Sequence, residues 1–126
     1  MSEERFSGHC HCGAVTFEVS GPPDHHALCH CADCRMCAGA PMVGWYAVRE
    51  EAFRLTGGEP VEYASSAHGR RFFCGRCGSG LFYRNAEVLP GIVDVQSALL
   101  DRIDELVPEA HIQLADAVAW EGRMAD

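Results

Sequence analysis

Lysine is absent from this sequence, and its absence excludes one common class of partner. All ten basic side chains are arginines, and 18 acidic residues give the chain a formal net charge of −8. A protein that follows a phosphate backbone needs clustered Lys and Arg side chains. We therefore predict that this protein does not bind nucleic acid.

Long hydrophobic runs are also missing. The longest stretch without a charged residue, from Met36 to Val48, has 13 residues and contains Pro41. A helix that crosses a bilayer needs about 20 apolar residues, so no membrane span is predicted. Residues 1–5 are mostly charged and lack the basic segment and apolar run of a signal peptide. We therefore expect a cytoplasmic location.

No long segment has the 3.6-residue periodicity of an amphipathic helix. Instead, residues from Val15 to Val19 alternate between apolar and polar, which predicts a half-buried strand. Trp45 and Tyr46 are neighbours on another predicted strand, so one should pack in the core and the other should line a cleft. Residues 1–126 fit a single domain, which we expect to be mainly β. Further strands are predicted over residues 25–31, 42–48, 52–55, 61–64, 70–73, 80–84, 92–96 and 111–114, and short helical segments over 32–38 and 100–107.

Cysteine is abundant and falls into three tight groups. The eight cysteines are Cys10 and Cys12, then Cys29, Cys31, Cys34 and Cys37, then Cys74 and Cys77. In a secreted protein they would form disulfides, but in reducing cytosol clustered cysteines more often bind metal or carry out redox chemistry. Thiols that only fill a core would not be concentrated in pairs. We therefore favour metal binding and keep a disulfide scaffold as the alternative.

The two outer pairs have the spacing of a structural zinc site. Zinc takes thiolate ligands in tetrahedral geometry, and ligands one or two residues apart can reach the same ion. Each pair is followed by a glycine, which lets the chain turn with positive φ so that backbone N–H groups point at the sulfurs. Joining Cys10 and Cys12 with Cys74 and Cys77 gives a closed four-thiolate site.

The central group differs because Cys29, Cys31 and Cys34 offer three ligands and leave one position of a tetrahedron open. Catalytic zinc keeps such an opening. Three thiolates weaken the ion as an activator of water but allow it to hold an incoming thiol as a thiolate, so we expect chemistry on a substrate sulfur. Cys37 follows Cys34 by one helical turn, and three roles stay open for it: a fourth ligand, a redox partner or a buried thiol.

The histidines are predicted to be secondary to the thiols. His11 and His30 each stand between two predicted ligands in extended segments, so their side chains should point away from the metals. His111 is predicted to be structural. Three others are expected in solvated loops: His25, His26 and His68.

Three segments carry a resemblance to a known family: residues 8–15 (GHCHCGAV), residues 29–35 (CHCADCR) followed by Gly39 and Ala40, and residues 73–79 (FCGRCGS). In this order they resemble the glutathione-dependent formaldehyde-activating enzyme family, which includes centromere protein V-like proteins. The resemblance implies a zinc-stapled β-tent of several short antiparallel strands with one or two short helical turns. It also implies two zinc ions. Cys10, Cys12, Cys74 and Cys77 would hold a structural ion, and Cys29, Cys31 and Cys34 would hold an ion with an open position.

The same resemblance implies an activity. Members of the family combine glutathione with formaldehyde to give S-hydroxymethylglutathione, which is carbon–sulfur lyase chemistry. We therefore expect a zinc-dependent enzyme whose partners are a small thiol such as glutathione and a small aldehyde. Arginine binds carboxylates bidentately, and Arg35, next to the open site, is a candidate anchor for glutathione. Further candidates lie near the later cysteine pair: Arg70, Arg71, Arg76 and Arg84.

Two other functions stay open. A non-catalytic protein-interaction module would use both zinc ions as staples and would fill the fourth ligand position. A metal sensor or thiol redox buffer would release zinc on mild oxidation. The sequence does not predict the oligomeric state.

Overall fold

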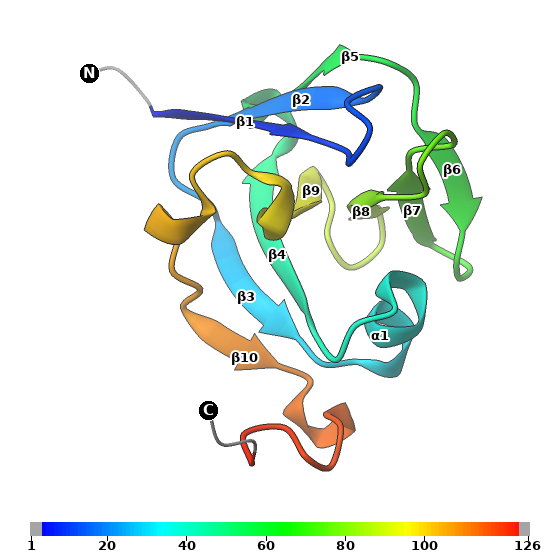
Figure 1. Cartoon of the computed structure of the whole chain (residues 1–126), viewed down its shortest axis with the longest axis vertical. Helices are drawn as coiled ribbons and strands as arrows, with labels where there is room; N and C mark the ends of the chain where they lie inside the picture. The colour runs from blue at the N-terminus through cyan, green and yellow to red at the C-terminus, as the bar shows by residue number, and fades with distance from the viewer. Residues whose placement is uncertain (1–3, 124–126) are drawn as a thin grey trace.

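Ten strands in two sheets form the framework of the described part of the chain (Figure 1). The computed structural model describes residues 4–123; residues 1–3, which belong to the charged start, and residues 124–126 lie outside the described part. The smaller sheet is antiparallel, in the order β1-β2-β5, and its strands are β1 (Arg5–His9), β2 (Thr16–Ser20) and β5 (Phe53–Gly57).

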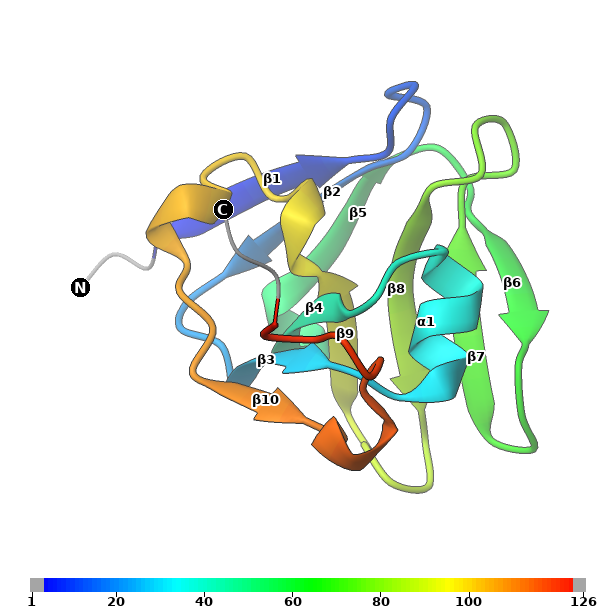
Figure 2. The same ribbon diagram turned by 60° about the horizontal axis from the view of Figure 1, so that its bottom comes forward.

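The larger sheet has seven strands in the order β10-β3-β4-β9-β8-β7-β6. Its strands are β3 (His25–Cys29), β4 (Val43–Arg49), β6 (Val61–Ala64), β7 (Gly69–Phe73), β8 (Gly80–Asn85), β9 (Ile92–Gln96) and β10 (Ala110–Ile112). One α-helix, α1 (Ala32–Ala38), follows β3, and short 3-10 turns cover Glu50–Ala52, Ser97–Leu99, Ile103–Glu105 and Leu114–Asp116. Figure 2 shows α1 lying over β7 and β8 of the large sheet.

The prediction of a mainly β fold is confirmed. One pairing differs from the expected antiparallel arrangement, because β10 runs parallel to β3. The predicted helix over residues 100–107 is largely wrong. Leu100 instead forms an isolated bridge with Gly8, and the N–H of Asp101 donates to the carbonyl of Ser7 over 2.8 Å, so only Ile103–Glu105 turns helically.

The first strand, β1, was not predicted, because only Phe6 and Gly8 face inward in its five residues. The glycine is required by packing. A Cβ atom at Gly8 would lie 2.3 Å from the ring of Phe17, which is itself buried on β2. The apolar–polar alternation that would indicate this strand is weak, because one of its two inward positions is Gly8, which is not hydrophobic.

The main core lies between the two sheets. The small sheet contributes Phe6, Phe17 and Val19, while Tyr46 and Phe82 come from the large one. Tyr46 is 2% exposed, and the next residue back, Trp45, packs on the other face with the central cysteines. The prediction that Trp45 and Tyr46 would divide between core and cleft is confirmed.

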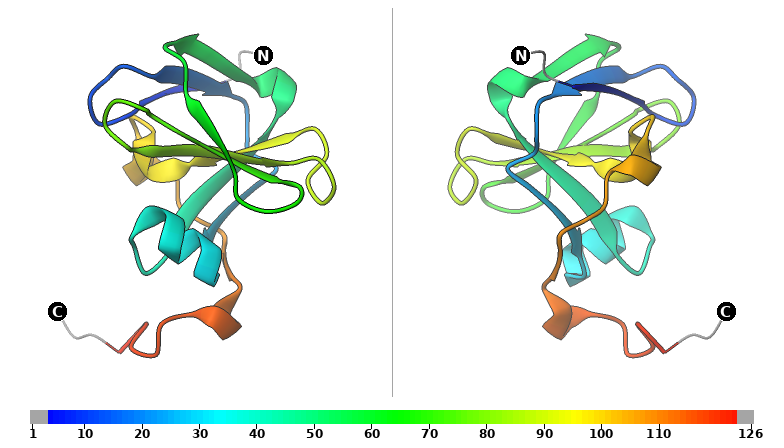
Figure 3. Two further views of the ribbon diagram at one scale, coloured as in Figure 1. Left: turned by 90° about the vertical axis from the view of Figure 1, so that its right-hand side faces the viewer. Right: turned by 90° about the vertical axis from the view of Figure 1, so that its left-hand side faces the viewer.

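The C-terminal part of the described chain lies beside β3. Figure 3 shows β10 and the turns that follow it extending from the end of β3, away from the small sheet. The N–H of His30 donates to the carbonyl of Ile112 over 3.1 Å and so continues the parallel pairing beyond β3. Within residues 4–123, no helix has the length and apolar composition that a membrane crossing requires.

Candidate metal and substrate site

The four outer cysteines converge although more than 60 residues separate the two pairs. One sulfur from each of Cys10, Cys12, Cys74 and Cys77 lies within 4.8 Å of the others. The Sγ of Cys12 is 3.7 Å from that of Cys10 and 3.8 Å from that of Cys74. Two thiolates on one tetrahedral zinc, with bonds of about 2.3 Å, stand about 3.8 Å apart. The spacing of these sulfurs therefore fits a zinc ion.

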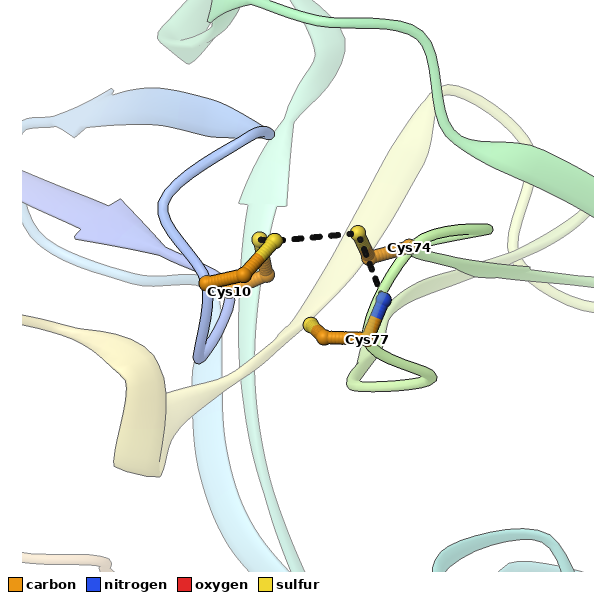
Figure 4. A group of neighbouring side chains, drawn as sticks. Cys10, Cys74 and Cys77 are labelled. Carbon is orange, nitrogen blue, oxygen red and sulfur yellow. Dashed lines mark hydrogen bonds between the residues drawn. The ribbon is translucent and has the colours of Figure 1, made fainter.

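Backbone turns aim N–H groups at these sulfurs (Figure 4). Gly78 has a φ of 81°, and the N–H groups of Arg76 and Cys77 each lie 3.4 Å from the Sγ of Cys74. Hydrogen bonds from the side chain and backbone of Ser79 lower the pKa of the Cys77 thiol to about 5. Such donors stabilise a thiolate, which is the form that binds metal.

The inner cluster forms where β3 passes into α1. Sulfurs of Cys29, Cys31 and Cys34 lie within 4.8 Å of one another. Cys31 is the N-cap of α1, and its Sγ accepts a hydrogen bond from the N–H of Cys34 over 3.3 Å. The helix ends at Gly39, whose φ of 63° is left-handed. The short capped helix thus folds the third thiol back onto the first two.

The thiols of this cluster differ in acidity. Burial raises the pKa of Cys29 to about 12. Burial also opposes ionisation of Cys31, but hydrogen bonds from the backbone and thiol of Cys34 outweigh it, so the pKa of Cys31 is lowered. Cys31, at the N-cap of α1, is therefore the first thiol of the cluster to lose its proton.

Cys37 does not join the inner cluster. Within residues 4–123, the sulfurs that lie close together here are those of Cys29, Cys31 and Cys34. The side chain of Cys37 is exposed. Three residues along an α-helix correspond to a rotation of about 300°, which leaves about 60° between Cys34 and Cys37. The prediction of a buried thiol is wrong, and the arrangement does not support a fourth ligand. All eight cysteines lie within the described residues, and none of them forms a disulfide.

Two cavities adjoin the inner cluster. One, of about 260 Å³, is lined by all three clustered cysteines together with Tyr83 and Asp94. The other, of about 350 Å³, is lined by Cys37 and by aromatic side chains of β7 and β8. Trp45 and Arg71 line both cavities. These two side chains therefore lie between the clustered thiols and the second cavity.

The floor of the first cavity comes from one row of side chains across the large sheet. Register places Arg71 beside Tyr83, Tyr83 beside Asp94, and Asp94 beside Ala47. The Arg71 guanidinium carbon lies 5.0 Å from the centre of the Tyr83 ring. Burial raises the pKa of Asp94 to about 6, although the nearby His25 lowers it. A cation, a phenol and a carboxyl group thus face the thiols.

Of the five candidate arginines, the structure brings Arg71 to the thiols. Its Nη2 lies 3.8 Å from the Sγ of Cys34, and its Nε is buried without a hydrogen-bond partner within residues 4–123. Arg35 lies on α1 and lines neither cavity, although its Nε is also buried and unpartnered in the described chain. Arg84 is paired with Glu50 instead.

Asp94 was not predicted as a site residue. Its signal in the sequence is a lone acidic residue in an otherwise apolar strand, Ile92-Val93-Asp94-Val95. The histidine predictions divide. His11 is exposed. His26, however, is 3% exposed on β3 and not in a solvated loop, because its ring packs against Tyr46 at 5.4 Å between centres.

The chain is similar to several known proteins. The model of a protein family described as "Glutathione-dependent formaldehyde-activating enzyme" matches residues 5–116. A Halomonas elongata protein named "Putative glutathione-dependent formaldehyde-activating enzyme" is 30% identical over 125 residues, covering 90% of this chain and 77% of the relative. A Schizosaccharomyces pombe protein named an uncharacterized lyase is 28% identical over 79 residues, covering 62% of this chain and 56% of its own length.

The fold also resembles a solved structure. A crystal structure of a Rhodobacter sphaeroides protein superposes with a TM-score of 0.64 at 24% identity, covering 83% of this chain and 98% of that protein. At this level of identity the likeness concerns the fold alone.

Proposed function

Because this chain belongs to the glutathione-dependent formaldehyde-activating enzyme family, we propose that it is a zinc-dependent carbon–sulfur lyase. Its substrate is the adduct of glutathione, or a related thiol, with a small aldehyde such as formaldehyde. The observation that carries the proposal is the cavity of about 260 Å³ whose wall contains Cys29, Cys31 and Cys34.

The inner cluster provides the reacting position. Cys29, Cys31 and Cys34 would hold the zinc ion, which would supply an open position that favours the thiolate form of a substrate thiol. Arg71 lies beside this position and offsets the negative charge of the cluster and the substrate. The fourth-ligand role left open for Cys37 would have favoured an interaction module, so the exposure of Cys37 outside the cluster favours the enzyme.

The proposed reaction balances with one proton. In the direction of synthesis, the S–H group of the thiol loses its proton to the Asp94 carboxylate. The sulfur then bonds to the aldehyde carbon, and the C=O double bond becomes a C–O single bond. Asp94 then returns the proton to that oxygen, giving the hydroxymethyl thioether. The lyase direction reverses these steps. A carboxyl group with a pKa near 6 is suited to exchange protons near neutral pH.

The outer cluster is assigned a structural role. Zinc on Cys10, Cys12, Cys74 and Cys77 would tie the end of β1 to the turn between β7 and β8, giving two ions per chain. Residues 1–126 are proposed to form one domain of this kind. Arg35, next to Cys34 on α1, is kept as the proposed anchor for a glutathione carboxylate.

Exchange spectroscopy tests the activity directly. Magnetisation transfer by NMR between free glutathione and S-hydroxymethylglutathione, with formaldehyde present, should be accelerated by the zinc-loaded protein. Cys31→Ser should abolish the acceleration while one zinc ion and the fold are kept, and Cys37→Ser should retain it. An unaccelerated wild-type rate, or full acceleration by Cys31→Ser, would contradict the proposal.

A further inference from the structure

A third group of metal-ligand side chains lies next to the inner cluster but does not belong to it. One ligand atom from each of His30, His111 and Glu121 lies within 4.8 Å of the other two. His30 stands between Cys29 and Cys31 in the sequence. Alternation along an extended segment directs its side chain away from theirs. The ring therefore joins a separate cluster.

The backbone holds the first two members in place. His30 continues β3, and its N–H donates to the carbonyl of Ile112, the neighbour of His111 on β10. The Nε2 of His30 lies 2.9 Å from the Nδ1 of His111, across 81 residues of sequence. Glu121 comes from the last described turn, where its N–H donates to the carbonyl of Val118 over 3.0 Å. The cluster thus joins the chain's third strand to its C-terminal segment.

His30 is short of polar partners. Its ring is 0% exposed, and its Nδ1 has no hydrogen-bond partner within residues 4–123. The contact with His111 is the only polar contact of the ring among these residues. A fully buried imidazole with one ring nitrogen unpartnered is costly in free energy. A metal ion bound at the Nε2 would offset part of that cost through the coordinate bond, while the Nδ1 would stay without a partner.

The donor set has a known chemical preference. Two imidazole nitrogens with one carboxylate make the His₂Glu set of open zinc sites, and imidazole also suits cobalt, nickel and copper. Ligands about 2.0–2.1 Å from a tetrahedral ion stand about 3.3 Å apart. The two ring nitrogens therefore need to separate by only a few tenths of an ångström. His111 is exposed, which gives an ion a path of entry from solvent.

We propose that His30, His111 and Glu121 form a third divalent-metal site, free of thiolates, which takes zinc or a similar first-row ion. Bound metal ties the segment from Leu114 to Glu121 to the backbone that carries Cys29 and Cys31. This site is independent of the proposed lyase activity, because none of its three ligands lines the cavity beside the thiols.

Cobalt distinguishes this site from the two cysteine clusters. Thiolate ligands give Co²⁺ a strong near-ultraviolet charge-transfer band, whereas imidazole and carboxylate ligands do not. The full-length protein, loaded with two equivalents of zinc, is titrated with Co²⁺ while released zinc is measured. We expect one equivalent of Co²⁺ to bind without that band and without release of zinc.

Two substitutions test the assignment of the ligands. His111→Ala and Glu121→Gln should each weaken this binding by more than the roughly 10–100-fold that loss of an outer partner costs. The matched control is His68→Ala, which removes an exposed histidine that also pairs with a glutamate, Glu87, and it should leave the binding unchanged. Circular dichroism and retention of two zinc ions confirm that each variant is folded.

Three results would overturn the proposal. The first is that the zinc-loaded protein binds no additional Co²⁺. The second is that Co²⁺ enters only by displacing zinc, with the thiolate band. The third is that Glu121→Gln, the variant least able to disturb the fold, binds Co²⁺ as tightly as the wild type.

Discussion

The Nη2 of Arg71 lies 3.8 Å from the Sγ of Cys34, so a half-buried cation on β7 of the large sheet touches the thiol cluster. Arg71 is held there by the ring of Tyr83, over which its guanidinium lies. Its Nε is buried and unpartnered in the described chain, which leaves a donor for an incoming anion. The contact between Arg71 and Cys34 links β7 to α1. It makes Arg71 the side chain best placed to hold a negatively charged thiol.

Replacing Arg71 therefore tests substrate binding. A hydrogen bond to a charged group contributes about 1.5–3 kcal/mol, so Arg71→Ala should raise the KM for glutathione about 10- to 100-fold. The measurement is the exchange rate as a function of glutathione concentration. Arg70→Ala is the matched control, because the adjacent side chain donates to the backbone of Ser66 instead. An equal effect of both substitutions would count against a specific role for Arg71.

The two cysteine clusters should differ in their effect on stability. Structural zinc contributes folding free energy directly, on the order of 10 kcal/mol in small zinc domains. Cys74→Ser, in the outer cluster, should therefore lower the free energy of unfolding by several kcal/mol or prevent folding. Cys34→Ser, in the inner cluster, should remove one zinc ion with a smaller loss.

Urea unfolding together with metal analysis measures both effects, and Cys37→Ser is the control that should change neither stability nor zinc content. Removal of zinc with a chelator should reproduce the larger loss. Equal destabilisation by Cys74→Ser and Cys34→Ser would show that the division into structural and open sites is wrong.

Gly8 should not tolerate a side chain. The added Cβ would approach the buried Phe17 ring to 2.3 Å, and overpacking of a core typically costs about 1–3 kcal/mol. Gly8→Ala should lower the free energy of unfolding by that amount, measured by urea or thermal denaturation. Ser7→Ala, at the exposed neighbouring position of β1, should have little effect. Unchanged stability of Gly8→Ala would mean that β1 and β2 are not packed as described.

Asp94 should make stability depend on pH. Its pKa is raised by burial from 3.8 to about 6, so the folded state binds its proton more tightly than the unfolded state. Protonated Asp94 therefore favours folding below pH 4, and this stabilisation is lost as the pH rises to about 6. At pH 7.5 the ionised carboxylate then costs about 2–3 kcal/mol.

Asp94→Asn removes this cost. The variant should be more stable than the wild type at pH 7.5, and the difference should shrink at pH 4.5. Comparing the two proteins at equal zinc content at each pH cancels the titration of the metal ligands. A difference that does not vary with pH would exclude the raised pKa. The same variant should slow the exchange reaction, because the amide cannot accept the thiol proton.

Much of this architecture could be predicted from the sequence. Alternation over residues 15–19 predicted β2, and the adjacent Trp45 and Tyr46 were correctly expected to face opposite ways. The pairs Cys10-x-Cys12 and Cys74-x-x-Cys77 identified the outer cluster, because ligands so close in sequence can reach one ion only through local turns. Such features are local: they depend on side-chain alternation and on the few residues of one turn.

The tertiary structure decided what depends on long-range register. No local pattern separates Arg71 from Arg70, yet the alignment of β7 with β8 sends one toward the thiols and the other toward a loop. Helix rotation separates Cys37 from Cys34, and the parallel pairing of β10 with β3 brings His111 to His30. In the two strand pairings, a shift of one residue would turn the side chain to the other face of the sheet. The sequence therefore determined most of the strands and the grouping of the outer cysteines, whereas only the packing of distant strands determined which side chains share a site.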